Sequence, residues 1–339
     1  MARLLASALL AVALWGAPAA AQSAADFYRG KTINIICGFG PGGGYDLYPR
    51  VLARHFSRHM PGNPTVVVQN MEGVGSARAA NYVFNVAAKD GTAIAAVNQN
   101  MPMYQLLGGA GAQFEAAKLQ YLGSMGSSNG LIYTWYTSGI KTIEDAKQHE
   151  VPLAAVGTTS DSHIFPTIVN ALVGTKFKPI PGYTGGTGQI NIAVERGEVM
   201  GRGGTSWSSV QTSNKSWLDG HKLNFLVQIG FRKEPDLPSV PLLQDLVTSP
   251  DDLAVVKVIS LPTALGYAHW VAPGVPQDRL DALRAAYTAT LSDPDFLKEA
   301  EKLHMEIRAQ TGGEVTALSK QVTDTPKAVL QRTAKILGW

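Results

Sequence analysis

From Lys31 onward, short β-branched segments alternate with longer segments of helical periodicity. The predicted strands of the first set lie at 33–36, 65–69 and 93–97, and the predicted helices lie at 45–60 and 76–88. A strand, a helix and a second strand in this order form a parallel βαβ unit. The alternation therefore predicts an α/β fold in which a mainly parallel sheet is flanked by helices.

A second set of alternating segments begins at Leu131. Its predicted strands lie at 131–137, 151–156 and 223–229, and its predicted helices lie at 142–148, 164–172 and 189–196. Residues 123–130 between the two sets are rich in Gly and Ser, as is common where a chain crosses between domains. A length of 339 residues also favours two domains.

The last part of the chain predicts three or four helices. Residues 277–291 carry an apolar stripe at helical spacing. Asp293 and Pro294 have the order of an N-cap and a first helical position, and Thr311 and Glu314 have the spacing of a capping box. We therefore expect helices to begin at both places.

The N-terminus has the order of a secretory signal peptide. Arg3 is followed by an apolar stretch at 4–15 and then by small residues of the A-x-A form at Ala19 and Ala21. The apolar stretch is shorter than the ~20 residues that a membrane-spanning helix needs. We expect a signal peptide at 1–21 that is cleaved after Ala21, rather than a buried or anchoring helix, and a mature protein in the periplasm.

Composition excludes several classes of protein. The 29 Lys and Arg residues against 26 Asp and Glu give a formal net charge of +3, and they form no dense basic cluster, so nucleic-acid binding is not expected. Cys37 is the only cysteine, which excludes an intrachain disulfide and a multi-cysteine metal site. His55 and His59 stand four residues apart, but no third ligand lies near them in sequence, and we interpret them as a solvated helix face. We expect no cofactor and no metal.

The strongest local motif follows the first predicted strand, at 38–46. Its glycines let the backbone bend tightly, and the helix that follows directs free N–H groups and the positive end of its dipole into the loop. Such a loop favours an anion. The glycines also fit the dinucleotide fingerprint G-x-G-x-x-G, but no acidic residue follows at the spacing of about 20 that ribose binding requires, and Pro41 stiffens the loop. A dinucleotide site is the less favoured interpretation.

A second motif, at 126–130, matches the G-x-S-x-G nucleophile elbow of hydrolases around Ser128. That elbow needs a helix after the serine, whereas a β-rich segment follows Gly130. We expect a protein that is not an enzyme, and a secreted hydrolase that uses Ser128 is the alternative.

Loops rich in Gly, Ser and Thr recur where predicted strands end or helices begin. Four more follow the first, at 72–76, 157–163, 182–188 and 203–206. Open α/β sheets bind ligands at this edge, so two such edges facing each other predict a cleft. A lining of backbone N–H groups and hydroxyls, with little charge, suits a small carboxylate.

At these loops the sequence resembles the extracytoplasmic solute receptors of the tripartite tricarboxylate transporter family, also called Bug receptors. The similarity runs from about Tyr28 to the C-terminus. Its motifs are, in chain order, FGPGGGxD at 39–46, VVVQN followed by GVGS within 66–76, KDGT at 89–92, TSDSH at 159–163, YTGG at 183–186, RxxxDLPSVP at 232–241 and APxxP at 272–276. The order and coverage of these motifs make the resemblance more specific than any one of them.

The resemblance implies a two-domain Venus flytrap, like type II periplasmic binding proteins, in which each domain is a mainly parallel sheet flanked by helices. Domain 1 would comprise 22–125 plus 230–339, domain 2 would comprise 126–229, and the ligand cleft would lie between them, with hinges near 123–126 and Gly230. It also implies a monomer that passes a small organic acid, namely a di- or tricarboxylate, an aromatic acid or an acidic amino acid, to integral-membrane transporter subunits. A ligand-sensing receptor for a signalling kinase stays open as an alternative.

The resemblance further implies ligand contacts, in which main-chain N–H groups of the first two loops hold a carboxylate and polar groups of the second domain close on it. Carried over to this sequence, these contacts are Phe39, Gly42, Gly43, Gly75, Ser76, Thr158, Thr159, Ser162, Thr187, Gly188 and Thr205. His163 is either a further contact or a helix-capping or core residue. Arg202 departs from the family pattern, and it either pairs with a second carboxylate in the cleft or lies at a sheet edge on the surface.

Overall fold

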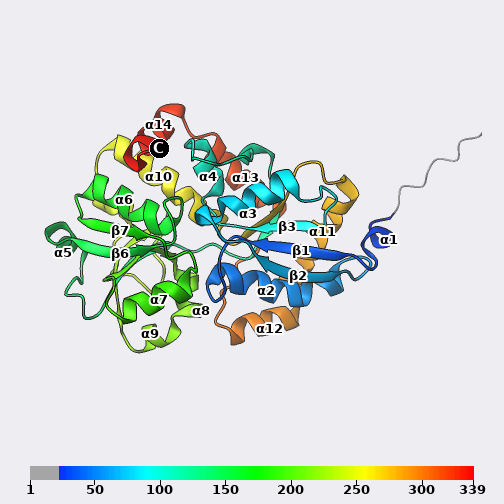
Figure 1. Ribbon diagram of the computed structural model, residues 1–339, viewed down its shortest axis with the longest axis horizontal. Coiled ribbons are helices and arrows are strands. Elements are labelled where there is room, and N and C mark those ends of the chain that lie inside the picture. The colour runs from blue at the N-terminus through cyan, green and yellow to red at the C-terminus, as the bar shows by residue number, and fades with distance from the viewer. Residues whose placement is uncertain (1–22) are drawn as a thin grey trace, which may run out of the picture.

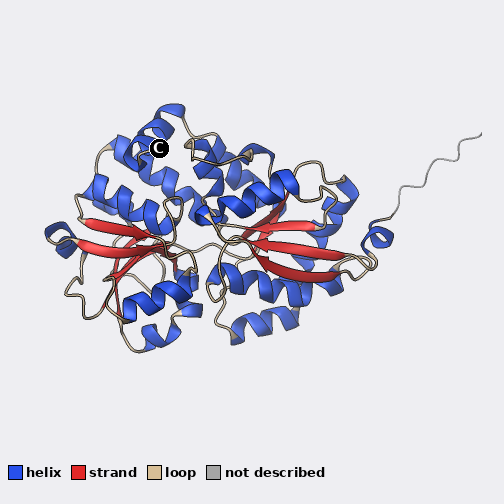
Figure 2. Ribbon diagram, viewed as in Figure 1, coloured by secondary structure: helices blue, strands red, loops and turns tan. Residues whose placement is uncertain are grey.

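A computed structural model describes residues 23–339, and the expected signal peptide at 1–21 lies outside them. The chain forms two lobes side by side, each built around one β-sheet (Figure 1). Helices cover the faces of both sheets (Figure 2). The α/β class that the sequence predicts is confirmed.

The first sheet is mixed, so the expectation of a mainly parallel sheet is wrong: two of its strand pairs are parallel and three are antiparallel. Its strands are β1 (Thr32–Cys37), β2 (Thr65–Asn70), β3 (Ala93–Ala96), β4 (Gln120–Ser124), β10 (Ala268–Val271) and β11 (Gln310–Thr311). They lie in the order β11-β4-β10-β3-β1-β2. β1 pairs in parallel with β2 and β3, whereas β10 runs antiparallel between β3 and β4. The βαβ units predicted at the start of the chain therefore form the parallel half of this sheet.

Helices pack on both faces of the first sheet. They are α1 (Ala24–Tyr28), α2 (Gly44–Phe56), α3 (Ala77–Asn81), α4 (Met101–Leu106), α11 (Gln277–Leu291), α12 (Pro294–Lys302) and α13 (Gly312–Thr323), with short turns η1 (Ser57–His59), η2 (Val74–Ser76), η3 (Tyr82–Val86) and η4 (Ala116–Lys118). Because side chains alternate along a strand, Ile35 of β1 shares an apolar cluster with Leu283 of α11, while Ile36 shares a different cluster with Val83. Asp293 and Thr311 cap α12 and α13 as the sequence predicts.

The second sheet has the same mixed pattern. Its strands are β5 (Gly130–Trp135), β6 (Val151–Ala155), β7 (Phe177–Pro181), β8 (Gly201–Ser206) and β9 (Leu223–Ile229) in the order β7-β6-β8-β5-β9. Its helices are α5 (Ile143–Gln148), α6 (Asp161–Val173), α7 (Thr187–Glu195), α8 (Trp207–Ser213) and α9 (Lys215–Asp219). β6 is parallel to β7 and β8, and β5 is antiparallel to β8 and β9. The central position of β8 places its side chains between the layers of the lobe.

Two chain segments cross between the lobes side by side. The first leads from β4 to β5, and the second is the turn between α10 (Pro250–Leu265) and β10. The N–H of Tyr267 donates to the carbonyl of Gly126 at 3.0 Å, and the N–H of Met125 donates to the carbonyl of Tyr267 at 3.3 Å. Gly266 has a φ of +55°, and a Cβ there would lie 1.8 Å from the carbonyl oxygen of Gly126, so the crossing requires glycine.

Residues after β9 stay close to that strand before the second crossing. The N–H of Gln228 donates to the carbonyl of Pro241 at 2.8 Å, and η5 (Leu243–Leu246) follows. The C-terminal helix α14 (Lys327–Leu337) packs on α6 and α10, so the end of the chain returns to the second lobe (Figure 1). The expected domain boundaries at 125/126 and 229/230 stay a prediction.

The predicted helix at 76–88 differs from the structure. α3 ends at Asn81, and the chain continues as the π-helical turn η3. Its start is also displaced, because Ser76 has a left-handed φ of +88° and belongs to the preceding loop. That loop contributes to the site described next.

Candidate functional site

Loops at the ends of strands from both sheets meet between the lobes and enclose a small cavity. It is lined from the first lobe by Phe39, Gly40, Gly43, Gly44 and Tyr45, and from the second by Asp161, Gly186, Thr187, Arg202, Thr205, Ser206 and Ser209. The space that the centre of a water molecule can occupy is about 20 Å³, room for about one water. The two lobes are therefore closed on each other here, and entry of an organic acid requires them to separate.

The first loop, at 38–43, is held in place by the buried carboxylate of Asp46. Arg50 Nε donates to both of its oxygens at 2.9 Å, Asn70 Nδ2 donates to Oδ1 at 2.8 Å, and the N–H of Gly42 donates to Oδ2 at 3.1 Å. Burial raises the pKa of Asp46, but these hydrogen bonds outweigh burial and bring the pKa below its ordinary value. Asp46 is thus ionised and positions the glycine-rich loop on α2.

The second loop, at 73–76, has a left-handed backbone. Val74, Gly75 and Ser76 have φ values of +46°, +56° and +88°. A β-branched residue rarely adopts such a φ, so this loop is strained. A contact from the other lobe stabilises this conformation, because Thr159 Oγ1 donates a hydrogen bond to the carbonyl of Val74 at 2.7 Å. A Cβ at Gly75 would lie 2.3 Å from the same Thr159 oxygen, so the close approach of the lobes requires glycine there.

Arg202 lies on β8 with 7% of its surface exposed. Its Nε donates to the carbonyl of Gly204 at 2.8 Å, and its Nη1 donates to Thr187 Oγ1 at 2.9 Å. It forms no ion pair within 4.0 Å with any residue that the structure describes. The alternative of a surface arginine at a sheet edge is wrong, because β8 pairs with β6 on one side and with β5 on the other.

Asp161 brings a second buried charge to the same cavity. It is the first residue of α6, and 7% of its surface is exposed. Its Oδ1 accepts from the N–H of Ser162 at 2.9 Å. Burial raises the pKa of Asp161 above its ordinary value, and the positive charge of Arg202 offsets only part of this rise. Sequence reasoning did not select Asp161, although it lies within the 157–163 loop that it did select.

Two aromatic side chains, Phe39 and Tyr45, line the cavity, and a second aromatic pair joins the lobes outside its lining. The rings of Phe39 and Tyr45 stack with centroids 4.6 Å apart, and Tyr48 stacks on Tyr267 at 3.8 Å. The Tyr267 hydroxyl is hydrogen-bonded to Ser206 Oγ of the second lobe at 2.9 Å. Burial raises the pKa of Tyr45 well above its ordinary value, so its phenol stays protonated. The stacked rings of Phe39 and Tyr45 thus give the cavity an apolar surface on the side of the first lobe.

The structure brings some of the residues selected from the sequence together and leaves others outside the lining. Those that line the cavity are Phe39, Gly43, Thr187, Arg202 and Thr205. Those that do not line it are Gly42, Gly75, Ser76, Thr158, Thr159, Ser162, His163 and Gly188. Lining residues that the sequence did not single out are Gly40, Gly44, Tyr45, Asp161, Gly186, Ser206 and Ser209. Most of these unselected lining residues belong to the five loops rich in Gly, Ser and Thr. The position of a loop after a strand therefore predicts its place in the cavity better than the type of any single residue does.

Several of the residues outside the lining have structural contacts. Ser76 Oγ donates to the carbonyl of Gly38 at 3.2 Å and links the first two loops. Ser162 Oγ accepts from the N–H of Val156 at 3.0 Å at the start of α6. His163 is half-buried on α6, burial lowers its pKa, and its Nδ1 is buried with no hydrogen-bond partner in the part of the chain described. Ligand contact by these residues stays a prediction.

Ser128 lies in the first crossing segment and lacks the setting of a nucleophile elbow. β4 ends at Ser124, and β5, not a helix, begins at Gly130. Ser128 Oγ accepts from the N–H of Ser208 at 3.1 Å and is hydrogen-bonded to Ser208 Oγ at 3.1 Å. No histidine among residues 23–339 hydrogen-bonds to it. These contacts make Ser128 part of the packing between the crossing segment and α8.

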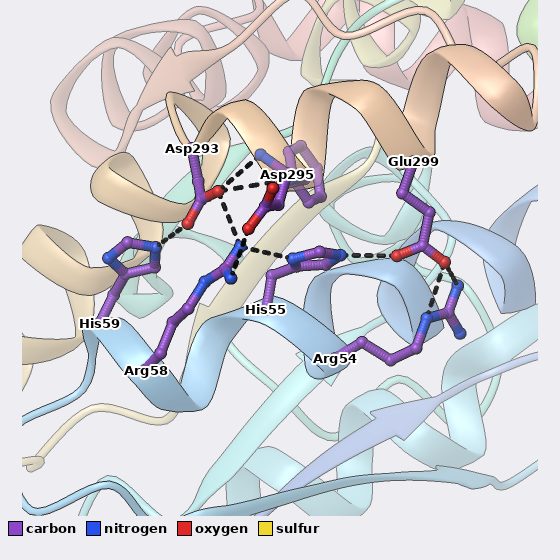
Figure 3. Close-up of polar contacts among 8 residues, drawn as sticks. Arg54, His55, Arg58, His59, Asp293, Asp295 and Glu299 are labelled. Atoms are coloured by element: carbon purple, nitrogen blue, oxygen red, sulfur yellow. Dashed lines mark hydrogen bonds and ion pairs between the residues drawn. The ribbon is translucent and has the colours of Figure 1, made fainter.

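His55 and His59 do not form a solvated helix face, and that expectation is wrong. His55 Nε2 lies 2.6 Å from Glu299 Oε2, and His59 Nε2 lies 2.6 Å from Asp293 Oδ2 (Figure 3). Arg58 reaches Asp293 between them. These side chains join the end of α2 and the turn η1 to α12 and its N-cap, so the two histidines contribute to packing between helices.

No three His, Cys, Asp or Glu side chains gather as a metal site requires anywhere in residues 23–339. Across the same residues, no helix combines the length and the apolar character needed to cross a membrane.

The chain is similar to known proteins over almost its whole length. No model of a protein family matches it. The UPF0065 protein in gbd 5'region of Cupriavidus necator is 26% identical over 337 residues, which cover 97% of this chain and 94% of that protein. Among solved structures, the periplasmic binding protein BugD has a TM-score of 0.69 at 20% identity, over 92% of this chain and 98% of BugD. MatC of Rhodopseudomonas palustris, solved with bound malate, has a TM-score of 0.67 at 17% identity, over 91% of this chain and 99% of MatC.

These similarities confirm the resemblance to the Bug receptors that the sequence motifs indicate. The solved structures confirm a two-lobed α/β fold, which this chain shares with BugD and MatC.

Proposed function

We propose that this chain is a periplasmic solute receptor of the Bug type, which binds a small organic carboxylate between its lobes and delivers it to a tripartite tricarboxylate-type membrane transporter. The observation that carries this proposal is Arg202, a buried arginine that lines the cavity between the lobes and has no acidic partner within 4.0 Å among the described residues.

The electrostatics of the cavity support an anionic group on the ligand. A buried cation without a partner carries a desolvation cost, and a carboxylate that pairs with it offsets that cost. Arg202 is already oriented by its bonds to Gly204 and Thr187, so a ligand carboxylate meets a fixed guanidinium. Pre-orientation reduces the entropy lost on binding.

The contacts between the lobes support binding by closure. Thr159 reaches Val74, and Ser209 Oγ accepts from the N–H of Gly44 at 3.4 Å. These bonds join groups on opposite lobes and form only when the lobes approach. A ligand that contacts both lobes would shift the molecule toward this closed arrangement.

The relatives support the ligand class, and the sequence resemblance supports the partner. MatC was solved with malate, a small carboxylate, and BugD is a periplasmic binding protein. The resemblance to receptors of tripartite tricarboxylate transporters supports delivery to membrane subunits. Periplasmic location and removal of residues 1–21 follow from the same resemblance and from the N-terminal sequence pattern.

Thermal unfolding tests the proposal. Di- and tricarboxylates, aromatic acids and acidic amino acids are added singly to the purified mature protein, and ligands that co-purify are identified by mass spectrometry. Binding to the folded state at a concentration 100-fold above Kd adds about 2.7 kcal/mol to the free energy of unfolding, so at least one acid raises Tm. The proposal fails if no acid raises Tm and no acid co-purifies.

A further inference from the structure

The cavity carries two opposite charges that are not paired with each other. Asp161 and Arg202 both line it, and each is 7% exposed. Within residues 23–339, neither forms an ion pair at 4.0 Å or less. Buried charges are normally paired, so a cavity of this kind is complementary to a ligand that carries both signs.

Asp161 occupies the place where a second anion would otherwise bind. The N-terminus of a helix favours negative charge, and α6 is 13 residues long. Asp161 is the first residue of α6, and Asp161 Oδ1 accepts a hydrogen bond from the N–H of Ser162 at 2.9 Å. A ligand carboxylate on this side of the cavity would meet a carboxylate of the protein. The group that faces Asp161 is therefore a donor rather than an anion.

Arg202 defines the side that accepts a carboxylate. Its Nε and Nη1 are used by Gly204 and Thr187, while Nη2 donates to no residue that the structure describes. The Tyr45 hydroxyl accepts from the N–H of Gln99 at 3.1 Å, and burial together with the negative charge of Asp161 raises the pKa of this phenol. The positively charged donor Arg202 and the negatively charged acceptor Asp161 thus line the same small cavity.

We propose that the ligand carries a protonated amine in addition to its carboxylate, and that Asp161 binds the amine while Arg202 binds the carboxylate. This inference rests on the proposed function and narrows its ligand class from organic acids to amino acids. A dicarboxylate would bring two negative charges to a cavity whose own charges cancel. An amino acid brings a positive charge to Asp161 and a negative charge to Arg202.

Matched pairs of acids with and without the amine test the inference. The pairs are succinate and aspartate, glutarate and glutamate, and butyrate and 4-aminobutyrate, each titrated calorimetrically into the mature protein. A hydrogen bond between charged groups is lost when the amine is absent, so the amine-bearing member of at least one pair binds about tenfold or more tightly than its partner.

Two variants assign the preference to its residue. Asp161→Asn keeps the size of the side chain and removes its charge, and it is expected to reduce the preference for the amine to less than about threefold. Asp219→Asn is the matched control, because it makes the same charge change on an exposed part of α9, where Asp219 pairs only with Lys215 in the described chain. The control keeps the preference of the wild type.

The outcomes separate this inference from the proposed function. Binding of succinate, glutarate or butyrate as tightly as the amine-bearing partner, with no effect of Asp161→Asn, overturns the inference and leaves the receptor function standing. A preference that survives in Asp161→Asn overturns the role of Asp161. Absence of binding by all six acids, together with no thermal shift by any other acid, counts against the proposed function itself.

Discussion

Thr159 of the second lobe donates a hydrogen bond of 2.7 Å to the carbonyl of Val74 on the first lobe. Val74 is held there at a φ of +46°, a conformation that a β-branched residue rarely adopts. The bond thus joins the lobes at a strained loop, and closure and loop conformation depend on each other.

Replacement of Thr159 by Val is expected to favour separation of the lobes. The closed state loses one neutral hydrogen bond, worth about 1 kcal/mol, and the ratio of closed to open molecules falls about fivefold. Small-angle X-ray scattering of the free protein measures the change as a larger radius of gyration. Thr288→Val on the exposed surface of α11 is the matched control. An unchanged radius in Thr159→Val would show that this bond does not hold the lobes together.

Replacement of Arg202 by Gln is expected to weaken ligand binding. Loss of charge-assisted hydrogen bonds to a carboxylate raises Kd by about 10-fold to 100-fold, measured by calorimetry with the acid that gives the largest thermal shift. Arg196→Gln, whose side chain is 71% exposed, is the control for charge. Equal affinity of Arg202→Gln and the wild type would remove Arg202 from the site.

Replacement of Gly266 by Ala is expected to destabilise the crossing between the lobes. The added Cβ would meet the carbonyl oxygen of Gly126 at 1.8 Å, so the backbone must shift. Chemical denaturation should show a loss of at least ~2 kcal/mol in the free energy of unfolding. Gly139→Ala is the matched control, since Gly139 also has a positive φ of +80° but has no atom within 4 Å of its Cβ position. A loss no greater than that of the control would contradict the clash.

Stability is expected to fall between pH 7 and pH 5 through His269. Burial lowers the pKa of His269 to about 4, so the unfolded chain, with a pKa near the ordinary value, takes up the proton first as pH falls. The folded state is therefore favoured above the unfolded pKa, and this advantage is lost progressively down to about pH 4. Linkage gives a loss of about 2 kcal/mol from pH 7 to pH 5. Denaturant titrations at both pH values should show a smaller loss in His269→Gln than in the wild type.

The contact between α2 and α12 is expected to depend on Asp293. Burial raises its pKa, but hydrogen bonds from His59 and the N–H groups of Asp295 and Phe296, together with the charge of Arg58, lower the pKa to about 2. The stabilisation is thus present above the ordinary carboxyl pKa and is lost as pH falls toward 2. Asp293→Ala, which removes both the helix cap and the ion pairs, should lower Tm more than Asp293→Asn, which can still cap α12.

The local parts of the fold are largely readable from the sequence. Alternation of strand and helix segments predicts both α/β lobes, and the caps at Asp293 and Thr311 lie where their spacing places them. Glycine-rich loops after strands predict where a cleft forms, because their position at a sheet edge follows from βαβ connectivity. These features depend on residues that are close in the sequence.

Other elements could not be predicted from the sequence, because their apolar residues do not recur with the period of a strand or of a helix. β8 reads GRGGTS and contains no large apolar side chain, yet it is a central strand because it is enclosed by β6 and β5. α10 is apolar on most of its surface because it packs on α4, α13, α14 and β9 together. Burial from several sides removes the alternation that marks an element at the surface.

The sequence by itself determined many of the secondary elements, the loops rich in Gly, Ser and Thr and the kind of protein the chain resembles, since these depend on local propensity and on order along the chain. Only the tertiary structure decided that Arg202 is buried and that Asp161 lines the same cavity. Asp161 starts a helix and Arg202 lies on a strand, and the two come together because β6 and β8 are neighbours in the sheet. The cavity therefore contains one acidic and one basic side chain because β6 and β8 are adjacent in the sheet, and no sequence motif contains both residues.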